Sequence, residues 1–444
     1  MGKKIEVPEI YETINRNLKV GVRQNQIYLK REQNWHPMLQ CEFAIEIRRL
    51  YPEADRKKIS SGAIKEVIER LLQEPSLQLQ FMEETEKRYV KLLDSIFDVE
   101  TGKIIPKMDK DFGYFLNFSY IESDKRRGHM QNFDKYISSV FPEDTKAKKQ
   151  FMLEILGYVL SDYTIAKAGF FFIGESNSGK STILELIQRI LPEHAVTNLS
   201  LDMLGNRFNL ARLADSRVNI CTELNKNSFA ATDVFKMLTS NEKITAEHKG
   251  CKPFEFRMRC KSLNAGNIIP DIKEEEGMGA MLNRMIILLF PIGISRSEQD
   301  NSLIEKLFEE RDCIFSSALD ALVDLRKRDF VFREPRDTQK IKRQMRLQEH
   351  ALDSFLSYCC IMEKEAKEHL VTMYESFSDY CKNNALELRY TATQFSQYLC
   401  QKPEIEHGKF RIDGSKPLSG MKGIRLKSDA EYNTRKIPIH IPKD

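Results

Sequence analysis

The 444-residue sequence lacks several features that mark common classes of protein. It has no apolar run of about 18 or more residues, which a membrane-spanning helix requires. Its first ten residues, MGKKIEVPEI, lack the apolar core of a signal peptide. The nine cysteines are scattered without a C-x-x-C pair, which argues against a disulfide framework and a structural zinc site. We therefore expect a cytoplasmic protein with no membrane partner.

The sequence also lacks a strong excess of charge of one sign. Its 69 Lys and Arg residues and 65 Asp and Glu residues leave a net charge of +4, so global charge does not indicate a nucleic-acid partner. A local excess exists near the end of the chain, where Lys409 to Lys443 contain nine basic residues against three acidic ones. A nucleic-acid contact would therefore depend on a local basic surface.

Length and composition indicate several globular domains. A chain of this length normally forms two to four domains, and 41% hydrophobic with 30% charged residues is typical of a globular protein. Helical periodicity predicts a helical region over residues 1–85. Residues 86–162 are expected to contain both strands and helices. A small strand pair is predicted within 92–121, followed by two helices that Pro142 separates.

The middle of the chain has a different pattern of apolar residues. Short apolar strands alternate with helices in residues 163–296, which predicts a mainly parallel α/β sheet. Residues 297–335 are helical and end in a linker. Residues 336–444 contain two or three helices and then short strands. The fold class is therefore multidomain α/β.

The stretch FFIGESNSGKST, residues 171–182, matches the pattern G-x-x-x-x-G-K-[ST]. In such a loop glycines let backbone amides surround phosphates, the lysine reaches the β and γ phosphates, and the hydroxyl ligates Mg²⁺. The position between a predicted strand and a predicted amphipathic helix disfavours the alternative, an incidental Gly/Ser turn. The expected nucleotide-binding residues are Gly174, Glu175, Ser176, Asn177, Ser178, Gly179, Lys180, Ser181 and Thr182.

Three further residues stand near ends of predicted strands. Glu223 leaves the strand RVNICTEL and is a candidate for magnesium handling, water activation or both, although solvent-facing glutamates are common there. Asn267 ends KSLNAGN and would orient water or sense the γ phosphate, unless it serves only the turn before Pro270. Arg284 precedes MIILLF and would either stabilise the transition state of a neighbouring subunit or occupy a strand edge.

Residues 243–258, KITAEHKGCKPFEFRM, predict a β-hairpin because two alternating segments flank a Gly- and Pro-containing turn. Its tip carries His248, Lys249 and Lys252. These side chains would grip a phosphate backbone, whereas the simpler interpretation is a solvated turn.

This order of motifs resembles a superfamily 3 helicase, and more narrowly the phage and plasmid primase-helicase family with its poxvirus-type members. The stretches LGYVLSDYTIAKAGFFFIGESNSGKSTILELI, FKMLTSNEKITAEHKGCKPFEF and NAGNIIP carry most of the likeness, which covers residues 90–295 well. The resemblance implies an AAA+ ATPase that uses ATP and Mg²⁺ and assembles as a ring, usually a hexamer, around single-stranded DNA.

The same resemblance implies residue roles. Lys180 and Ser181 would bind phosphate and Mg²⁺, Glu223 would serve catalysis and hold the metal, Asn267 would be the sensor, and Arg284 would act across the subunit interface. The DNA-binding residues would be His248, Lys249 and Lys252 at the hairpin. The hairpin motif of the family often begins Gly-Asp, whereas this chain has Asn241 and Glu242.

The resemblance also assigns functions to whole segments. Residues 86–162 would form a collar-type domain, 163–296 the AAA+ core, 297–335 a helical lid, and 336–444 a winged-helix-like DNA-binding domain for origin duplex DNA. No primase domain is expected, so primer synthesis would fall to a separate primase, and a loading protein is a further possible partner. The expected function is a 3′ to 5′ DNA helicase for a mobile element. An ATP-switched origin-binding initiator is the alternative, and a small-molecule kinase a weaker one.

Overall fold

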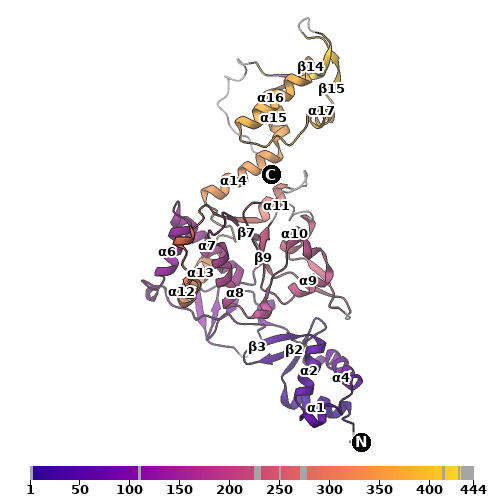
Figure 1. Ribbon diagram of the computed structural model, residues 1–444, viewed down its shortest axis with the longest axis vertical. Coiled ribbons are helices and arrows are strands. Elements are labelled where there is room, and N and C mark those ends of the chain that lie inside the picture. Colours follow the sequence, from indigo (N-terminus) through magenta and orange to yellow (C-terminus); the bar gives the residue numbers. More distant parts are fainter. Residues whose placement is uncertain are drawn as a thin grey trace. The chain divides into compact units, whose positions relative to one another are not determined.

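The computed structural model describes residues 4–108, 112–224, 232–249, 252–270, 278–412, 416–428 and 431. The chain divides into two compact units, Met1–Thr338 and Gln339–Asp444 (Figure 1). The first unit contains every residue expected in the nucleotide site.

The first unit is built around a five-stranded parallel sheet, which confirms the predicted α/β core. The strands run in the order β13-β7-β12-β9-β8. Residues 170–172, all phenylalanine, are buried in the sheet. A parallel strand that is covered on both faces favours such a continuous apolar sequence over alternation. The strands are β7 (Gly169–Gly174), β8 (Val196–Thr197), β9 (Val218–Leu224), β12 (Lys261–Gly266) and β13 (Met285–Phe290).

Helices cover this sheet. Figure 1 shows α6, α7, α12 and α13 to the left of the sheet and α9 and α10 to its right. Pro142 separates α6 from α7, as predicted. Helices α7 and α13 pack very closely, because Gly157 has no side chain and a Cβ there would lie 2.1 Å from the Ala318 carbonyl oxygen. The helices are α6 (Gln131–Val140), α7 (Thr145–Leu160), α8 (Lys180–Ile190), α9 (Arg207–Leu213), α10 (Thr232–Thr239), α11 (Met278–Arg284), α12 (Leu303–Glu309) and α13 (Arg311–Arg326).

The prediction that residues 1–85 are helical was wrong in part. Helices α1 (Val7–Asn17), α2 (Gln40–Arg49), α3 (Glu53–Arg56), α4 (Ser61–Gln73) and α5 (Met82–Thr85) are joined by an antiparallel sheet of β1 (Val20–Arg23), β2 (Gln26–Arg31) and β3 (Asn34–Met38). Gln24 and Asn25 form the first turn with positive φ angles of 50° and 59°. Neither residue is glycine, so the usual sequence signal of a tight hairpin is missing.

The segment expected to hold a small strand pair contains three strands. They are β4 (Tyr89–Lys91), β5 (Ile96–Asp98) and β6 (Lys103–Ile105), and they form one antiparallel sheet. Gly102 has a φ of 68° in the turn between the second and third strands, a conformation that glycine adopts without strain.

A buried ion cluster joins the N-terminal part of the first unit to the parallel sheet. It alternates in sign along the series Asp215, Arg23, Glu84, Arg259, Asp162 and Arg217, with contacts of 2.5 Å between Asp215 and Arg23 and 2.6 Å between Asp162 and Arg217. Three carboxylates therefore balance three guanidinium groups. Lys261 lies beside them, and burial, assisted by Arg217, lowers its pKa to about 7. About half of the Lys261 amines are therefore neutral at pH 7, in keeping with a cluster whose other charges already balance.

The second unit combines helices with a three-stranded antiparallel sheet of order β14-β16-β15. Phe355, Phe377 and Phe395 meet in its core. Strand β14 was not among the predicted strands, since its charged stretch EKEAKE shows no strand alternation. The elements are α14 (Arg336–Glu349), α15 (Ala351–Cys359), β14 (Cys360–His369), α16 (Leu370–Asn383), α17 (Ala392–Cys400), β15 (Glu406–Phe410) and β16 (Leu418–Leu426).

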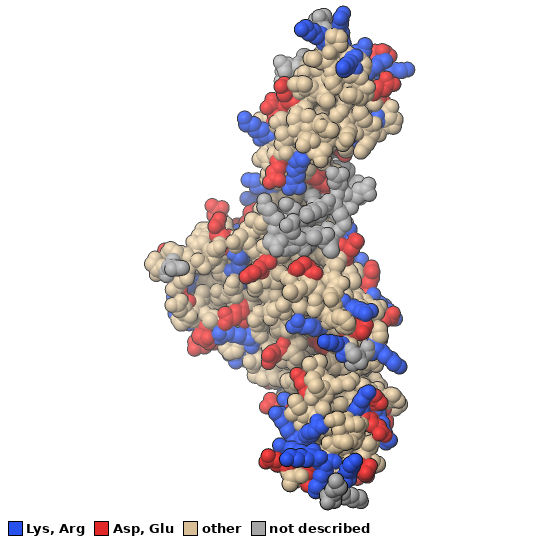
Figure 2. All heavy atoms as spheres, turned by 45° about the vertical axis from the view of Figure 1, so that its right-hand side comes forward, with Lys and Arg blue, Asp and Glu red and all other residues tan. Residues whose placement is uncertain are grey.

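The surface carries charges of both signs. Figure 2 shows Lys and Arg side chains interspersed with Asp and Glu side chains over the visible face, in keeping with the small net charge. No helix among the described residues is long and apolar enough to cross a membrane.

Candidate nucleotide-binding site

The phosphate loop follows β7 and leads directly into α8, as predicted. Gly174 must be glycine, because a Cβ there would lie 1.8 Å from the Phe290 carbonyl oxygen. Gly179 has a φ of 88° and precedes the first residue of α8. A Cβ on Gly179 would lie 2.8 Å from the Tyr136 ring and 2.9 Å from Val140. Both glycines of the motif are thus fixed by sterics rather than by turn formation alone.

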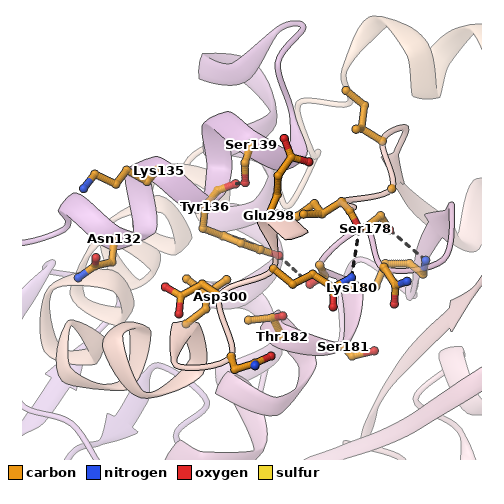
Figure 3. A pocket seen from close by; sticks show the side chains of 18 residues that line it. Asn132, Lys135, Tyr136, Ser139, Ser178, Lys180, Ser181, Thr182, Glu298 and Asp300 are labelled. Carbon is orange, nitrogen blue, oxygen red and sulfur yellow. Dashed lines mark hydrogen bonds between the residues drawn. The ribbon is translucent and has the colours of Figure 1, made fainter. Parts of the chain in front are cut away.

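The side chain of Lys180 lies inside the loop. Its amine donates hydrogen bonds to the carbonyl oxygens of Gly174 at 2.8 Å and Glu175 at 2.5 Å, and to the Ser178 hydroxyl at 3.0 Å. Figure 3 shows this side chain at the centre of the cavity-lining residues. Burial lowers the pKa of Lys180, and the charge of Glu175 partly opposes that shift. The loop therefore holds the positive charge of Lys180 at the place to which the backbone amides at the start of α8 also point.

The candidate sensor lies against the phosphate loop. The Asn267 amide donates to the Ser176 hydroxyl at 3.3 Å, although the two residues are 91 positions apart. Strand β12, which ends just before Asn267, pairs with β7 on one side and β9 on the other. Gly266 lies opposite Ile173 in one pairing and Leu224 in the other, so the three strands end at one edge of the sheet.

Glu223 stands at this same edge on β9, and its side chain is exposed. Strand β12, which Asn267 follows, separates β9 from β7, the strand that leads into the loop. The structure therefore brings Lys180, Asn267 and Glu223 to one edge, as the sequence predicted, with Glu223 the outermost of the three.

A cavity of about 640 Å³ opens beside the loop. It is lined by the loop itself, by α6 and by the segment 292–303 (Figure 3). Its volume falls within the range of about 300–1,000 Å³ that is usual for small-molecule sites. The backbone N–H of Ile294 donates to the Asn177 carbonyl oxygen at 3.0 Å and fixes the segment against the loop. The sequence analysis did not identify this segment, since it carries no recognised motif.

Tyr136 on α6 is the second contribution that the sequence analysis missed. Its hydroxyl donates to the Gly179 carbonyl oxygen at 2.9 Å, and its side chain is 2% exposed. Burial raises the pKa of Tyr136 far above its ordinary value, so the hydroxyl remains a donor at neutral pH. Glu310 fixes α6 in turn, because its carboxylate accepts from the backbone N–H groups of Asn132 and Phe133.

The Tyr136→Phe variant is expected to bind a nucleotide less tightly. It loses one hydrogen bond to the loop, worth about 1 kcal/mol, or roughly a fivefold rise in the Kd of the nucleotide. The matched control is Tyr374→Phe, which removes a 2.7 Å hydrogen bond from a tyrosine hydroxyl to the Tyr390 carbonyl oxygen in the second unit. An unchanged Kd in Tyr136→Phe would show that the hydroxyl does not position the loop.

The predicted hairpin is confirmed, with β10 (Lys243–Ala246) antiparallel to β11 (Phe254–Arg257). Lys249 and Lys252 are exposed at its tip, whose residues 250–251 lie outside the described part of the chain. His248 is half-buried instead. Its ring stacks on Phe254 with centroids 5.0 Å apart, and burial lowers its pKa, which favours the neutral imidazole at neutral pH.

Arg284 lies far from the phosphate loop of its own chain. It ends α11, and the next residue, Met285, pairs with Gly169 at the beginning of β7. The loop starts at the other end of β7, five residues or about 17 Å away. One guanidinium N–H of Arg284 donates to the Ala280 carbonyl oxygen at 3.1 Å, and its buried Nε has no hydrogen-bond partner among the residues that the structure describes.

The donor set fits a nucleotide with its magnesium ion better than a metal bound by protein alone. No group of three or more His, Cys, Asp or Glu side chains able to hold a metal occurs among the described residues. Mg²⁺ in nucleotide sites usually takes one or two protein ligands and completes its shell with phosphates and water. Ser181 and Glu223 are the residues that would supply them, and Lys180 in its cradle of carbonyls would meet the phosphates.

Comparison with known proteins agrees with this fold. Residues 172–284 match the sequence model of a family described as "Family of unknown function (DUF5906)". That range contains every site residue predicted from the sequence, whereas α6 and the segment 292–303, which also line the cavity, lie outside it. Comparison with curated proteins finds no match.

Among solved structures, the chain is similar to the apo A form of the NrS-1 C-terminal region. The two share 11% identity over 94% of this chain and 100% of the other, with a TM-score of 0.50. Another apo structure of the same region has 12% identity over 95% of this chain and 100% of the other, with a TM-score of 0.48. The comparison confirms, at the level of fold, the resemblance indicated by the motifs.

Proposed function

We propose that the chain is an ATP-driven DNA helicase that serves replication of a phage, plasmid or other mobile element. The observation that carries this proposal is the common sheet edge of Lys180, Asn267 and Glu223. The sheet order places the loop strand β7 in second position, with the Asn267 strand β12 between it and the Glu223 strand β9. An AAA+ ATPase core has this arrangement of loop, sensor and acid, and we assign residues 163–296 to it.

The geometry supports specific roles in hydrolysis. Lys180 and the amides at the start of α8 would hold the β and γ phosphates, and Mg²⁺ at Ser181 and Glu223 would offset their charge. Glu223, exposed at the sheet edge, would accept the proton of the attacking water. Asn267 would orient that water or sense the γ phosphate, because its amide already contacts the loop at Ser176. Catalysis would come mainly from stabilising charge that develops on the phosphoryl oxygens.

The site is proposed to be shared between subunits of a homo-oligomeric ring, with six as the expected number. Arg284 cannot reach its own loop from the opposite end of β7, so the guanidinium would act on the nucleotide of a neighbouring subunit. Residues 86–162 would form the collar of the ring, 297–335 its helical lid, and 1–85 a region of unassigned role.

Movement along single-stranded or forked DNA, in the 3′ to 5′ direction, would be produced by the hairpin. Its exposed Lys249 and Lys252 are suited to backbone phosphates, and a ring of such tips would follow one strand. His248 would contribute through its stacking on Phe254, since the ring is half-buried against the hairpin. A separate primase or a loading protein would act beside the helicase.

The second unit supports duplex binding. After α14, its elements follow the order helix, strand, helix, helix, strand, strand, with the first strand beside the last. This is the order of a winged-helix domain, in which α17 would enter a groove and the β15–β16 connection would form the wing. Residues 336–444 would therefore bind origin duplex DNA. This unit is also the observation that favours the alternative function, an ATP-switched origin-binding initiator.

The Lys249→Ala/Lys252→Ala variant tests the helicase proposal against the alternative of an origin-binding initiator. In the helicase, loss of the two tip cations is expected to reduce unwinding of forked DNA by more than tenfold while basal ATPase activity persists, because neither residue touches the nucleotide site. Strand displacement and ATP hydrolysis are measured on the same preparation, with sizing in magnesium-ATP and DNA. The matched control, Lys57→Ala/Lys65→Ala, removes two exposed lysines elsewhere. Undiminished unwinding in the tip variant, or a wild-type monomer that unwinds nothing, would contradict the helicase proposal.

A further inference from the structure

Helix α14 presents two exposed basic side chains, Lys340 and Arg343, that pair with no acidic residue in the described part of the chain. The helix contains five basic and two acidic residues. Lys340 and Arg343 are three positions apart, so their side chains lie within about 60° of each other around the helix axis. Both are exposed. Neither makes an ion pair or hydrogen bond with any residue that the structure describes.

A solvated helix in the same chain is built differently. In α4, Lys65 pairs with Glu69 at 3.9 Å and Arg70 pairs with Glu66 at 2.7 Å, the i,i+4 pattern that stabilises an exposed helix. The positions four residues from Lys340 and Arg343 hold Arg336, Gln339, Gln344 and Leu347. None is acidic, and Arg336 repeats the positive charge. Asp337, three positions before Lys340, pairs with Lys148 at 2.5 Å instead. Like charges at this spacing destabilise a helix, so an anion at this face would relieve a cost that α4 does not carry.

Two glutamines fix α14 beside the segment that precedes α17. Gln344 donates to the Ala385 carbonyl oxygen at 2.7 Å. Gln348 both donates to the Glu387 carbonyl oxygen at 2.9 Å and accepts from the Glu387 N–H at 2.7 Å. Glu387 lies four residues before Thr391, the N-cap of α17. Four residues span at most about 14 Å, so α14 is held near the start of α17.

We propose that Lys340 and Arg343 bind the phosphate backbone of duplex DNA beside the groove that α17 enters. The inference rests on the winged-helix part of the proposed function and adds a contact outside the wing. Such a contact positions the domain on the duplex and reads no sequence, because phosphates are the same at every base pair. The two residues present no aromatic platform, so a stacked single strand is the less suitable occupant.

The test measures duplex affinity of the full chain as a function of salt. The Lys340→Gln/Arg343→Gln variant is compared with the wild type, with Lys57→Gln/Lys364→Gln as the control that removes two other exposed charges, and with the wing variant Lys409→Gln/Arg411→Gln. Each lost phosphate contact should make the slope of log K against log salt shallower by about 0.9. The α14 variant should therefore lose about 1.8 from the slope, with unchanged basal ATPase activity, and the control should lose nothing.

The outcomes distinguish this inference from the function on which it rests. A slope for the α14 variant equal to that of the control overturns the inference, and a reduced slope for the wing variant would then leave the winged-helix assignment standing. Equal slopes for all variants would overturn both. A reduction that appears with single-stranded DNA but not with duplex would assign the α14 face to the single strand and overturn the duplex proposal.

Discussion

Replacing Lys180 with alanine is expected to abolish ATP hydrolysis, with a fall in kcat of at least about a thousandfold. The amine is the one cation inside the described part of the loop, where it bonds to the Gly174 and Glu175 carbonyl oxygens and the Ser178 hydroxyl. Removing a single charge-stabilising group from a phosphoryl-transfer or oxyanion site costs about 10²–10³ in rate. The loss of a buried cation that also binds the ground state adds to that cost.

The measurement is steady-state release of phosphate, with Lys65→Ala as the control for an exposed lysine on α4. The same variant also tests the shared site. Mixed with Arg284→Ala, it should regain part of the wild-type rate, because some interfaces would combine an intact loop with an intact arginine. Normal turnover in Lys180→Ala would refute the site, and absence of any recovery in the mixture would place Arg284 outside the catalytic interface.

Strand ends explain why much of the candidate site was predictable. Gly174, Glu223 and Asn267 lie at or beside the ends of buried apolar strands, and parallel strands bring their ends to one edge of a sheet. The hairpin was also predictable, because alternation of Phe254 and Phe256 with polar residues persists on both sides of its turn. In each case the local pattern and the tertiary structure favour the same element.

Other features depend on contacts that no local pattern encodes. Tyr136 meets Gly179 across 43 positions, and only the packing of α6 on the loop reveals it. Strand β14 was missed because cross-strand pairing with β16, rather than its own charged sequence, makes it a strand. His248 was assigned to the hairpin tip, but stacking on Phe254 holds its ring against the hairpin. Tertiary context decides each of these positions.

The buried ion cluster yields the second large expected effect. The Asp162→Ala variant should lose about 3–5 kcal/mol of unfolding free energy, because buried Arg217 would lose the carboxylate that offsets its charge and Arg259 would lose one of two carboxylates. Asp162 is 3% exposed, and its carboxylate lies 2.6 Å from Arg217 and 3.1 Å from Arg259. Burial alone would raise the pKa of Asp162, but the two guanidinium groups hold it below its ordinary value.

The sign of the pH dependence follows from that shift. The stabilisation by Asp162 is fully present above its unfolded pKa of about 4 and is lost as pH falls through the lower folded value. Lys261→Met is the matched variant, since it removes an opposite charge from the same cluster. Burial lowers the pKa of Lys261 to about 7, below its unfolded value, so this residue makes stability rise with pH between about 7 and 10.

Denaturant unfolding of the two variants at pH 7 and pH 9 therefore gives opposite results. Asp162→Ala should be strongly destabilised at both pH values, because it breaks a balanced set of three carboxylates and three guanidinium groups. Lys261→Met should be as stable as the wild type or more stable at pH 7, and should lose the rise in stability toward pH 9. Equal destabilisation of the two variants would show that the cluster needs Lys261 as a fourth cation. The three carboxylates and three guanidinium groups would then not form a balanced set by themselves.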